Sequence, residues 1–111
     1  MLYSGDDSTA MGFMFCGGHG VISVTANVAP NIFSKMCKAA ISKNIDLAKS
    51  YNNKLLLLHK ELFCEPSPSP TKWVLYKLGK CKSPCSRLPI VDLSLQGESK
   101  VLDAMKLADL I

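Results

Sequence analysis

Short apolar runs alternate with clusters of small or polar residues near the start of the chain. Residues 1–3 are apolar and lead into Ser-Gly-Asp-Asp at residues 4–7, a cluster typical of a turn after a strand. Residues 8–16 predict a short helix, which the Gly-Gly-His-Gly run at 17–20 ends, because glycine tolerates the left-handed backbone of a helix end. Residues 21–25 are rich in β-branched side chains and predict a parallel strand covered on both faces.

Helical periodicity dominates the rest of the chain. Residues 30–41 and 45–63 carry apolar side chains three and four positions apart, so each predicts an amphipathic helix, and the longer one needs another helix as its partner. The alternating Pro-Ser segment at 65–70 ends that helix, because proline disfavours helical geometry in the residue before it. A further helix is predicted over 70–78, and a last one over 96–110.

Two parallel strands cannot form a stable sheet alone, because their edges would stay unpaired. A β-α-β-α order followed only by helices is how a (β/α)8 TIM barrel ends when a helical domain is attached to it. We therefore predict an α/β fold, with strands seven and eight of the barrel in residues 1–43 and a C-terminal helical domain in residues 44–111. Such a chain on its own is expected to be marginally stable or to aggregate.

Composition narrows the class of protein. The 111 residues are 48% hydrophobic and 20% charged, which is typical of one globular domain and far short of a whole barrel. The net charge of +4 comes from single lysines between Lys35 and Lys106, without the dense basic run of a nucleic-acid surface. The apolar runs are shorter than a membrane span, and Asp6 and Asp7 lie where a secretory signal would be basic. We expect no nucleic-acid or membrane partner and a cytoplasmic location.

The cysteines could suggest a metal site. Five cysteines without a signal peptide fit reduced thiols better than a disulfide framework. Cys81 and Cys85 could join Cys64 and His59 around a metal, but no second close pair completes a recognised zinc spacing. We therefore expect no metal site.

Other polar residues fit structural roles better than chemical ones. Asp6 and Asp7 could act as an acid–base pair or bind magnesium, but adjacent acids after a strand more often form turns and cap helices. His19, between glycines, is expected to face solvent. His59 falls on the long helix and is expected at the surface or at an interface.

Several motifs resemble one enzyme family. Ser-Gly-Asp-Asp at 4–7 and Gly-Gly-His-Gly-Val-Ile-Ser-Val-Thr-Ala-Asn-Val-Ala-Pro at 17–30 resemble the last two barrel strands of the 4-hydroxy-tetrahydrodipicolinate synthase family, also called dihydrodipicolinate synthases. Glu-Pro-Ser-Pro-Ser-Pro-Thr-Lys at 65–72 and Arg-Leu-Pro at 87–89 are similar to later family motifs. The resemblance covers the whole chain and identifies it as a C-terminal portion.

The resemblance implies a lyase of lysine and diaminopimelate biosynthesis, without a cofactor, that condenses pyruvate with aspartate semialdehyde. A lysine on barrel strand six forms a Schiff base with pyruvate, and the proton-relaying tyrosine and threonine lie earlier still. This chain would therefore carry no catalytic residue and be inactive alone. Two positions match pyruvate-binding ones: Ile22 contacts the bound ligand, and Gly5 lets it approach the backbone. A homotetramer is also implied.

Two residues of the helical part bear on this resemblance. Lys72 follows the proline-rich bend beside an aromatic residue, but it lies outside the strands and is expected to be solvated rather than to form the Schiff base. Ser67 stands where the family often has asparagine, which leaves its role toward the second substrate open. Two alternatives also stay open: a related pyruvate-dependent sugar-acid aldolase, and a non-catalytic interaction protein that binds another chain through its strand edges and its helical apolar stripe.

Overall fold

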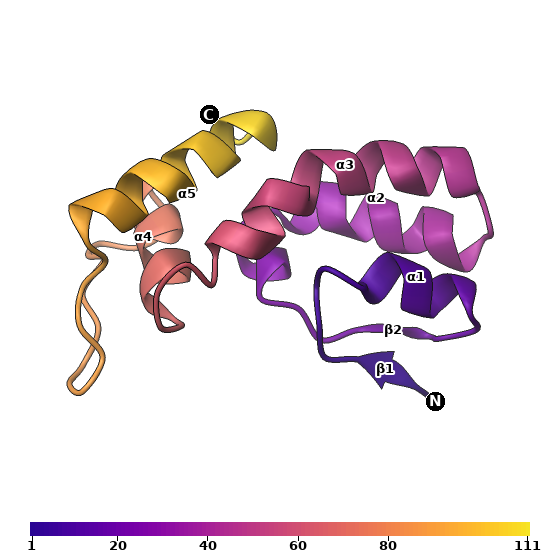
Figure 1. Ribbon diagram of the computed structural model, residues 1–111, viewed down its shortest axis with the longest axis horizontal. Coiled ribbons are helices and arrows are strands. Elements are labelled where there is room, and N and C mark those ends of the chain that lie inside the picture. The colour runs from indigo at the N-terminus through magenta and orange to yellow at the C-terminus, as the bar shows by residue number, and fades with distance from the viewer.

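All 111 residues are described by the computed structural model, which contains five α-helices, one 3-10 helix and two short strands (Figure 1). The elements are β1 (Tyr3–Ser4), α1 (Ala10–Phe15), β2 (Gly20–Val21), η1 (Thr25–Asn27), α2 (Pro30–Ile41), α3 (Ile45–Glu61), α4 (Ser69–Lys77) and α5 (Leu95–Leu107). The predicted order of strand, helix and strand, followed by helices only, is confirmed. No helix is long and apolar enough to cross a membrane.

The two strands pair in parallel. Tyr3 lies opposite Gly20 and Ser4 opposite Val21. The backbone ladder extends beyond the assigned strands, because the His19 amide donates to the Leu2 carbonyl at 2.8 Å and the Ile22 amide donates to the Ser4 carbonyl at 2.9 Å. The sequence thus predicted the partner strands and their direction correctly.

The predicted strand over residues 21–25 is wrong beyond Val21, because the chain turns into η1 at Thr25. Side chains take the backbone donors that a strand would use for its ladder. The Asp7 carboxylate accepts from the amides of Val24 and Thr25 at 3.1 and 3.0 Å, and the Ser23 hydroxyl accepts from the Ala26 amide at 2.9 Å. These bonds stabilise a turn where apolar character alone predicted extension.

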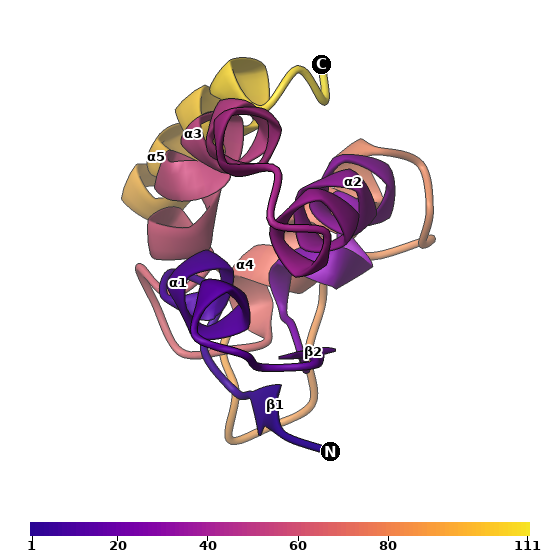
Figure 2. The same ribbon diagram turned by 90° about the vertical axis from the view of Figure 1, so that its right-hand side faces the viewer.

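α3 packs against α2 and α5, while α1 packs against α2 and α4 packs against α5. Figure 1 shows α1 and the strands at one end of the molecule and α4 with α5 at the other, and Figure 2 shows the same layers end-on. One buried apolar cluster runs through all of them, including Met14 of α1, Met36 of α2, Leu55 of α3 and Val101 of α5. The predicted domain boundary, between residues 43 and 44, therefore lies at the turn between α2 and α3, and the buried apolar cluster continues across it.

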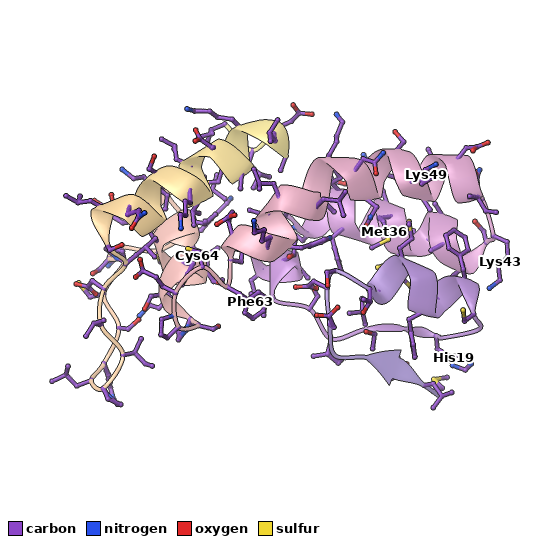
Figure 3. All side chains as sticks on the ribbon, viewed as in Figure 1. His19, Met36, Lys43, Lys49, Phe63 and Cys64 are labelled. Atoms are coloured by element: carbon purple, nitrogen blue, oxygen red, sulfur yellow. The ribbon has the colours of Figure 1, made fainter.

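The turn between α2 and α3 also bonds to the end of α1. Lys43 has a left-handed backbone (φ 61°), and its Nζ donates to the carbonyls of Met14 and Phe15 at 2.9 Å each (Figure 3). Carbonyls in the last turn of a helix have no intrahelical partner, so a lysine that bonds them stabilises the helix end. The link between α2 and α3 thereby fixes α1 in place.

Candidate functional site

The carboxyl ends of β1 and β2 bring together the two residues that the sequence assigned to a binding site. The parallel register continues past Ser4 and Val21 and sets Gly5 beside Ile22. The Ile22 side chain is 74% exposed, although it is large and apolar. A Cβ built on Gly5 would meet no atom within 4 Å. Nothing within the chain therefore requires glycine at residue 5 or covers Ile22.

Asp6 was predicted to cap a helix, but it forms the turn before α1 instead, because the cap residue of α1 is Thr9 and no side chain makes a cap hydrogen bond there. Its carboxylate accepts from the Thr9 amide at 2.9 Å and from the hydroxyls of Thr9 and Ser8 at 2.6 and 2.7 Å. The hydrogen bonds from Thr9, followed by that from Ser8, hold the pKa of Asp6 below its ordinary value. These residues keep the carboxylate charged and fix the loop that follows Gly5.

Asp7 caps an element remote in sequence, the short helix η1. The side chain is 4% exposed and accepts from both amides at the start of η1. A carboxylate bound by backbone amides forms charge-assisted hydrogen bonds, which are stronger than neutral ones. Asp7 therefore ties the loop after β1 to the loop after β2, directly behind Gly5 and Ile22.

His59 was predicted at the surface or at an interface, and this prediction is wrong, because the side chain is only 3% exposed. Its Nδ1 lies 2.8 Å from the Thr25 hydroxyl, and its ring meets the Phe33 ring edge-on, with centroids 5.8 Å apart. Burial lowers the pKa of His59, and the carboxylates of Asp7 and Asp6 partly offset this effect.

The helical spacing of α3 carried the signal that His59 is buried. Counting in steps of three and four from Ala48 reaches Asn52, Leu55, His59 and Leu62, all of which are buried. A histidine on that stripe belongs to the core face. The sequence could not predict that the Thr25 hydroxyl bonds with His59, because Thr25 lies on a segment predicted as a strand.

A cavity of about 360 Å³ opens beside these residues. Its lining comprises Asp6, Asp7, Ser8, Leu56, His59, Lys60 and Phe63. Figure 3 shows Phe63 just after α3, on the side of the helix that faces the loop after β1. Asp7 Oδ1 and His59 Nε2 are buried here without a hydrogen-bond partner in the chain.

The structure leaves other candidate residues outside this site. Lys72 lies on α4, half-buried rather than fully solvated, and its Nζ donates to the Cys85 carbonyl. His19 is exposed, as predicted, and its Nδ1 accepts from the Leu2 amide at 3.0 Å (Figure 3). Ser67 is exposed between α3 and α4. All five cysteines are free, and no three His, Cys, Asp or Glu residues come together where they could hold a metal ion.

Comparison with known proteins identifies close relatives of the chain. The Dihydrodipicolinate synthetase family matches residues 1–108. The 4-hydroxy-tetrahydrodipicolinate synthase of Laribacter hongkongensis is 54% identical over 110 residues, which are 99% of this chain and 38% of that protein. The corresponding synthase of Neisseria meningitidis serogroup B is 49% identical over 106 residues, covering 96% of this chain and 36% of its own length.

Solved structures agree with the sequence matches. The chloride-inhibited dihydrodipicolinate synthase of Acinetobacter baumannii, complexed with pyruvate, matches with a TM-score of 0.92 at 45% identity and covers 98% of this chain and 37% of its own. The dihydrodipicolinate synthase of Thermotoga maritima matches with a TM-score of 0.93 at 33% identity, over 100% and 37% of the two chains. The chain thus spans less than two-fifths of the length of these relatives, and by sequence and by fold it belongs to the dihydrodipicolinate synthase family.

Proposed function

We propose that this chain is the C-terminal segment of a 4-hydroxy-tetrahydrodipicolinate synthase, which condenses pyruvate, held as a lysine Schiff base, with aspartate semialdehyde. The main support is the Gly5–Ile22 pair at the carboxyl ends of two parallel strands, the edge where barrel enzymes bind their substrates. In this proposal β1 and β2 are strands seven and eight of a (β/α)8 barrel, residues 1–43 complete the barrel, and residues 44–111 form its helical appendix.

Each residue of the pair has a physical role in this proposal. Ile22 presents a branched apolar side chain that can pack against the methyl group of pyruvate while excluding water. Gly5 lacks a side chain where one would be free of clashes within this chain, so a ligand could approach its backbone closely. Both residues bind and neither transfers a proton. No metal or other cofactor is needed, because the Schiff base supplies the activation.

The Schiff-base lysine must come from outside residues 1–111. The first lysine of the sequence is Lys35, on α2, after both strands. Lysine suits this chemistry because a desolvated amine becomes nucleophilic near neutral pH, and such a site is completed by barrel strands on either side. Residues 1–111 alone are therefore expected to be inactive.

Two alternative functions would leave different observations. A related sugar-acid aldolase would use the same Schiff base with a sugar aldehyde, but the relatives described above are named 4-hydroxy-tetrahydrodipicolinate synthases. A non-catalytic interaction protein would use its exposed strand edge, where Met1 and Leu2 are 94% and 66% exposed, to bind another chain. The match over residues 1–108 favours the synthase.

The first experiment is the intact mass of the gene product from its own cells, followed by borohydride trapping of pyruvate. A mass near 12.1 kDa without trapping is expected of a truncated product. A larger mass with one pyruvate trapped per chain is expected of a whole synthase. Pyruvate trapped on a chain of 12.1 kDa would contradict the proposal, because a lysine within residues 35–106 would then form the Schiff base.

A joined enzyme tests the function directly. We define it as residues 1–111 fused behind the part of the Laribacter hongkongensis synthase that precedes the matched segment. It is expected to condense pyruvate with aspartate semialdehyde. Ile22→Ala in this enzyme is expected to raise the KM for pyruvate about tenfold, because most of the apolar side chain that would pack against pyruvate is lost. Preference for sugar aldehydes would support the aldolase, and a folded but inactive joined enzyme would overturn both.

A further inference from the structure

Three segments far apart in sequence meet behind the Gly5–Ile22 pair. Asp7, two residues after Gly5, accepts from the backbone amides of Val24 and Thr25, which follow Ile22 by two and three residues. Both bonds are about 3 Å long, and the carboxylate that makes them is 4% exposed. Because buried charge-assisted bonds hold their geometry closely, they fix the two loops relative to each other.

The third segment is α3, in the helical appendix. The Thr25 hydroxyl lies 2.8 Å from Nδ1 of His59, and both side chains are buried. Since the pKa of His59 is lowered by burial, its ring is neutral near neutral pH, and a hydroxyl that donates to Nδ1 leaves the proton on Nε2. The ring also packs edge-on against Phe33 of α2, which holds its orientation.

The geometry points to a positioning role: we propose that Asp7, Thr25 and His59 form a bridge that sets the strand ends carrying Gly5 and Ile22 against α3. This inference rests on the proposed function and deepens it. Through the bridge, the helical appendix governs the shape of the pyruvate site, although none of its residues touches pyruvate. The three side chains are positioning residues and take no part in the chemistry.

The bridge explains why two buried polar atoms lie beside it. Asp7 Oδ1 and His59 Nε2 are buried without a partner in the chain, and both residues contribute to the lining of the cavity. The other polar atom of each side chain takes part in the bridge: Asp7 Oδ2 accepts from two amides, and His59 Nδ1 bonds with the Thr25 hydroxyl. Hydrogen bonding by water or by the missing barrel segments would complete both groups without disturbing the bridge.

Thr25→Val in the joined enzyme tests this role, because valine keeps the shape of threonine and replaces only its hydroxyl by a methyl group. The buried Nδ1 of His59 then loses its partner, a cost that we expect to appear as about a tenfold higher KM for pyruvate. The kcat and the KM for aspartate semialdehyde are expected to change less than about threefold, because the reacting groups stay in place. Thr25→Ser keeps the hydroxyl and is expected to restore the KM for pyruvate.

The matched control is Thr71→Val on α4. Thr71 is also buried, at 6% exposed, but its hydroxyl has no hydrogen-bond partner. This variant is expected to keep the KM for pyruvate. If Thr25→Val lowers only the melting temperature and leaves that KM unchanged, the bridge merely stabilises the fold and the inference is wrong. If the unmodified joined enzyme fails to condense its substrates, the proposed function fails instead.

Discussion

The buried ring of His59 makes the free energy of unfolding depend on pH. Its folded pKa lies below the unfolded value of 6.5, chiefly because of burial, with Asp7 and Asp6 opposing the shift. Between these two pKa values only the unfolded chain binds the proton, so the contribution of His59 is complete above 6.5 and declines as the pH falls toward the folded pKa. Urea unfolding from about pH 7.5 to about pH 5 is expected to show this decline.

His59→Asn tests the assignment, because asparagine keeps a hydrogen-bonding group near Nδ1 but does not titrate. The variant is expected to lose the part of the pH dependence that lies just below 6.5, and His19→Asn, at the exposed histidine, is the matched control. An unchanged slope in His59→Asn would show that the ring is not buried in solution.

Single residues differ in how far the sequence could predict them. Motif resemblance selected Gly5 and Ile22, and their adjacency follows from a parallel register that short apolar runs could only suggest. The turn that Asp6 forms followed from its place after a strand, whereas the expected helix cap did not form. The partners of Asp7 could not be predicted, because a carboxylate can bind any backbone amides that folding brings close. Here these amides lie 17 and 18 residues away in sequence. Burial of His59 could have been read from helical spacing.

The elements were predicted where the signal is local. Helical periodicity and proline placed α2 to α5 within a few residues of their observed ends, because both act over one or two turns of the chain. The end of β2 could not be predicted in this way, since the amides of Val24 and Thr25 that follow it are bound by a side chain from another loop. The break after α1 was predicted from its glycines, and the structure adds a steric reason for one of them.

Two glycines near α1 are expected to respond oppositely to alanine. A Cβ on Gly18 would lie 2.1 Å from the Phe13 ring and 2.9 Å from its backbone oxygen, so Gly18→Ala is expected to cost about 1–3 kcal/mol of unfolding free energy. Gly12 lies inside α1 with open space around it, so Gly12→Ala is expected to gain about 0.5–1 kcal/mol. Urea midpoints of the two variants measure both. Equal shifts would argue against the packing of Phe13 on Gly18.

At the scale of the whole molecule, the strand unit combines exposed large apolar side chains with an unpaired strand edge. The large apolar side chains of Met1, Leu2, Tyr3 and Ile22 are all more than half exposed, and β1 has a neighbour on one side only. In the proposed barrel, other strands would cover this edge. The homotetramer that the family resemblance implies stays a prediction.

The uncovered strand edge is expected to make residues 1–111 self-associate when expressed alone, because unpaired backbone groups beside exposed apolar side chains are a template for further strands. Leu2→Glu sets a charge at this edge and is expected to lower the average mass in sedimentation at equal concentration. Leu95→Glu is the control: Leu95 is 84% exposed but begins α5, away from the strands, and the substitution changes the net charge equally. If both variants reduce association alike, net charge and not the edge governs it. If neither does, the strand edge does not govern association, and the prediction is wrong.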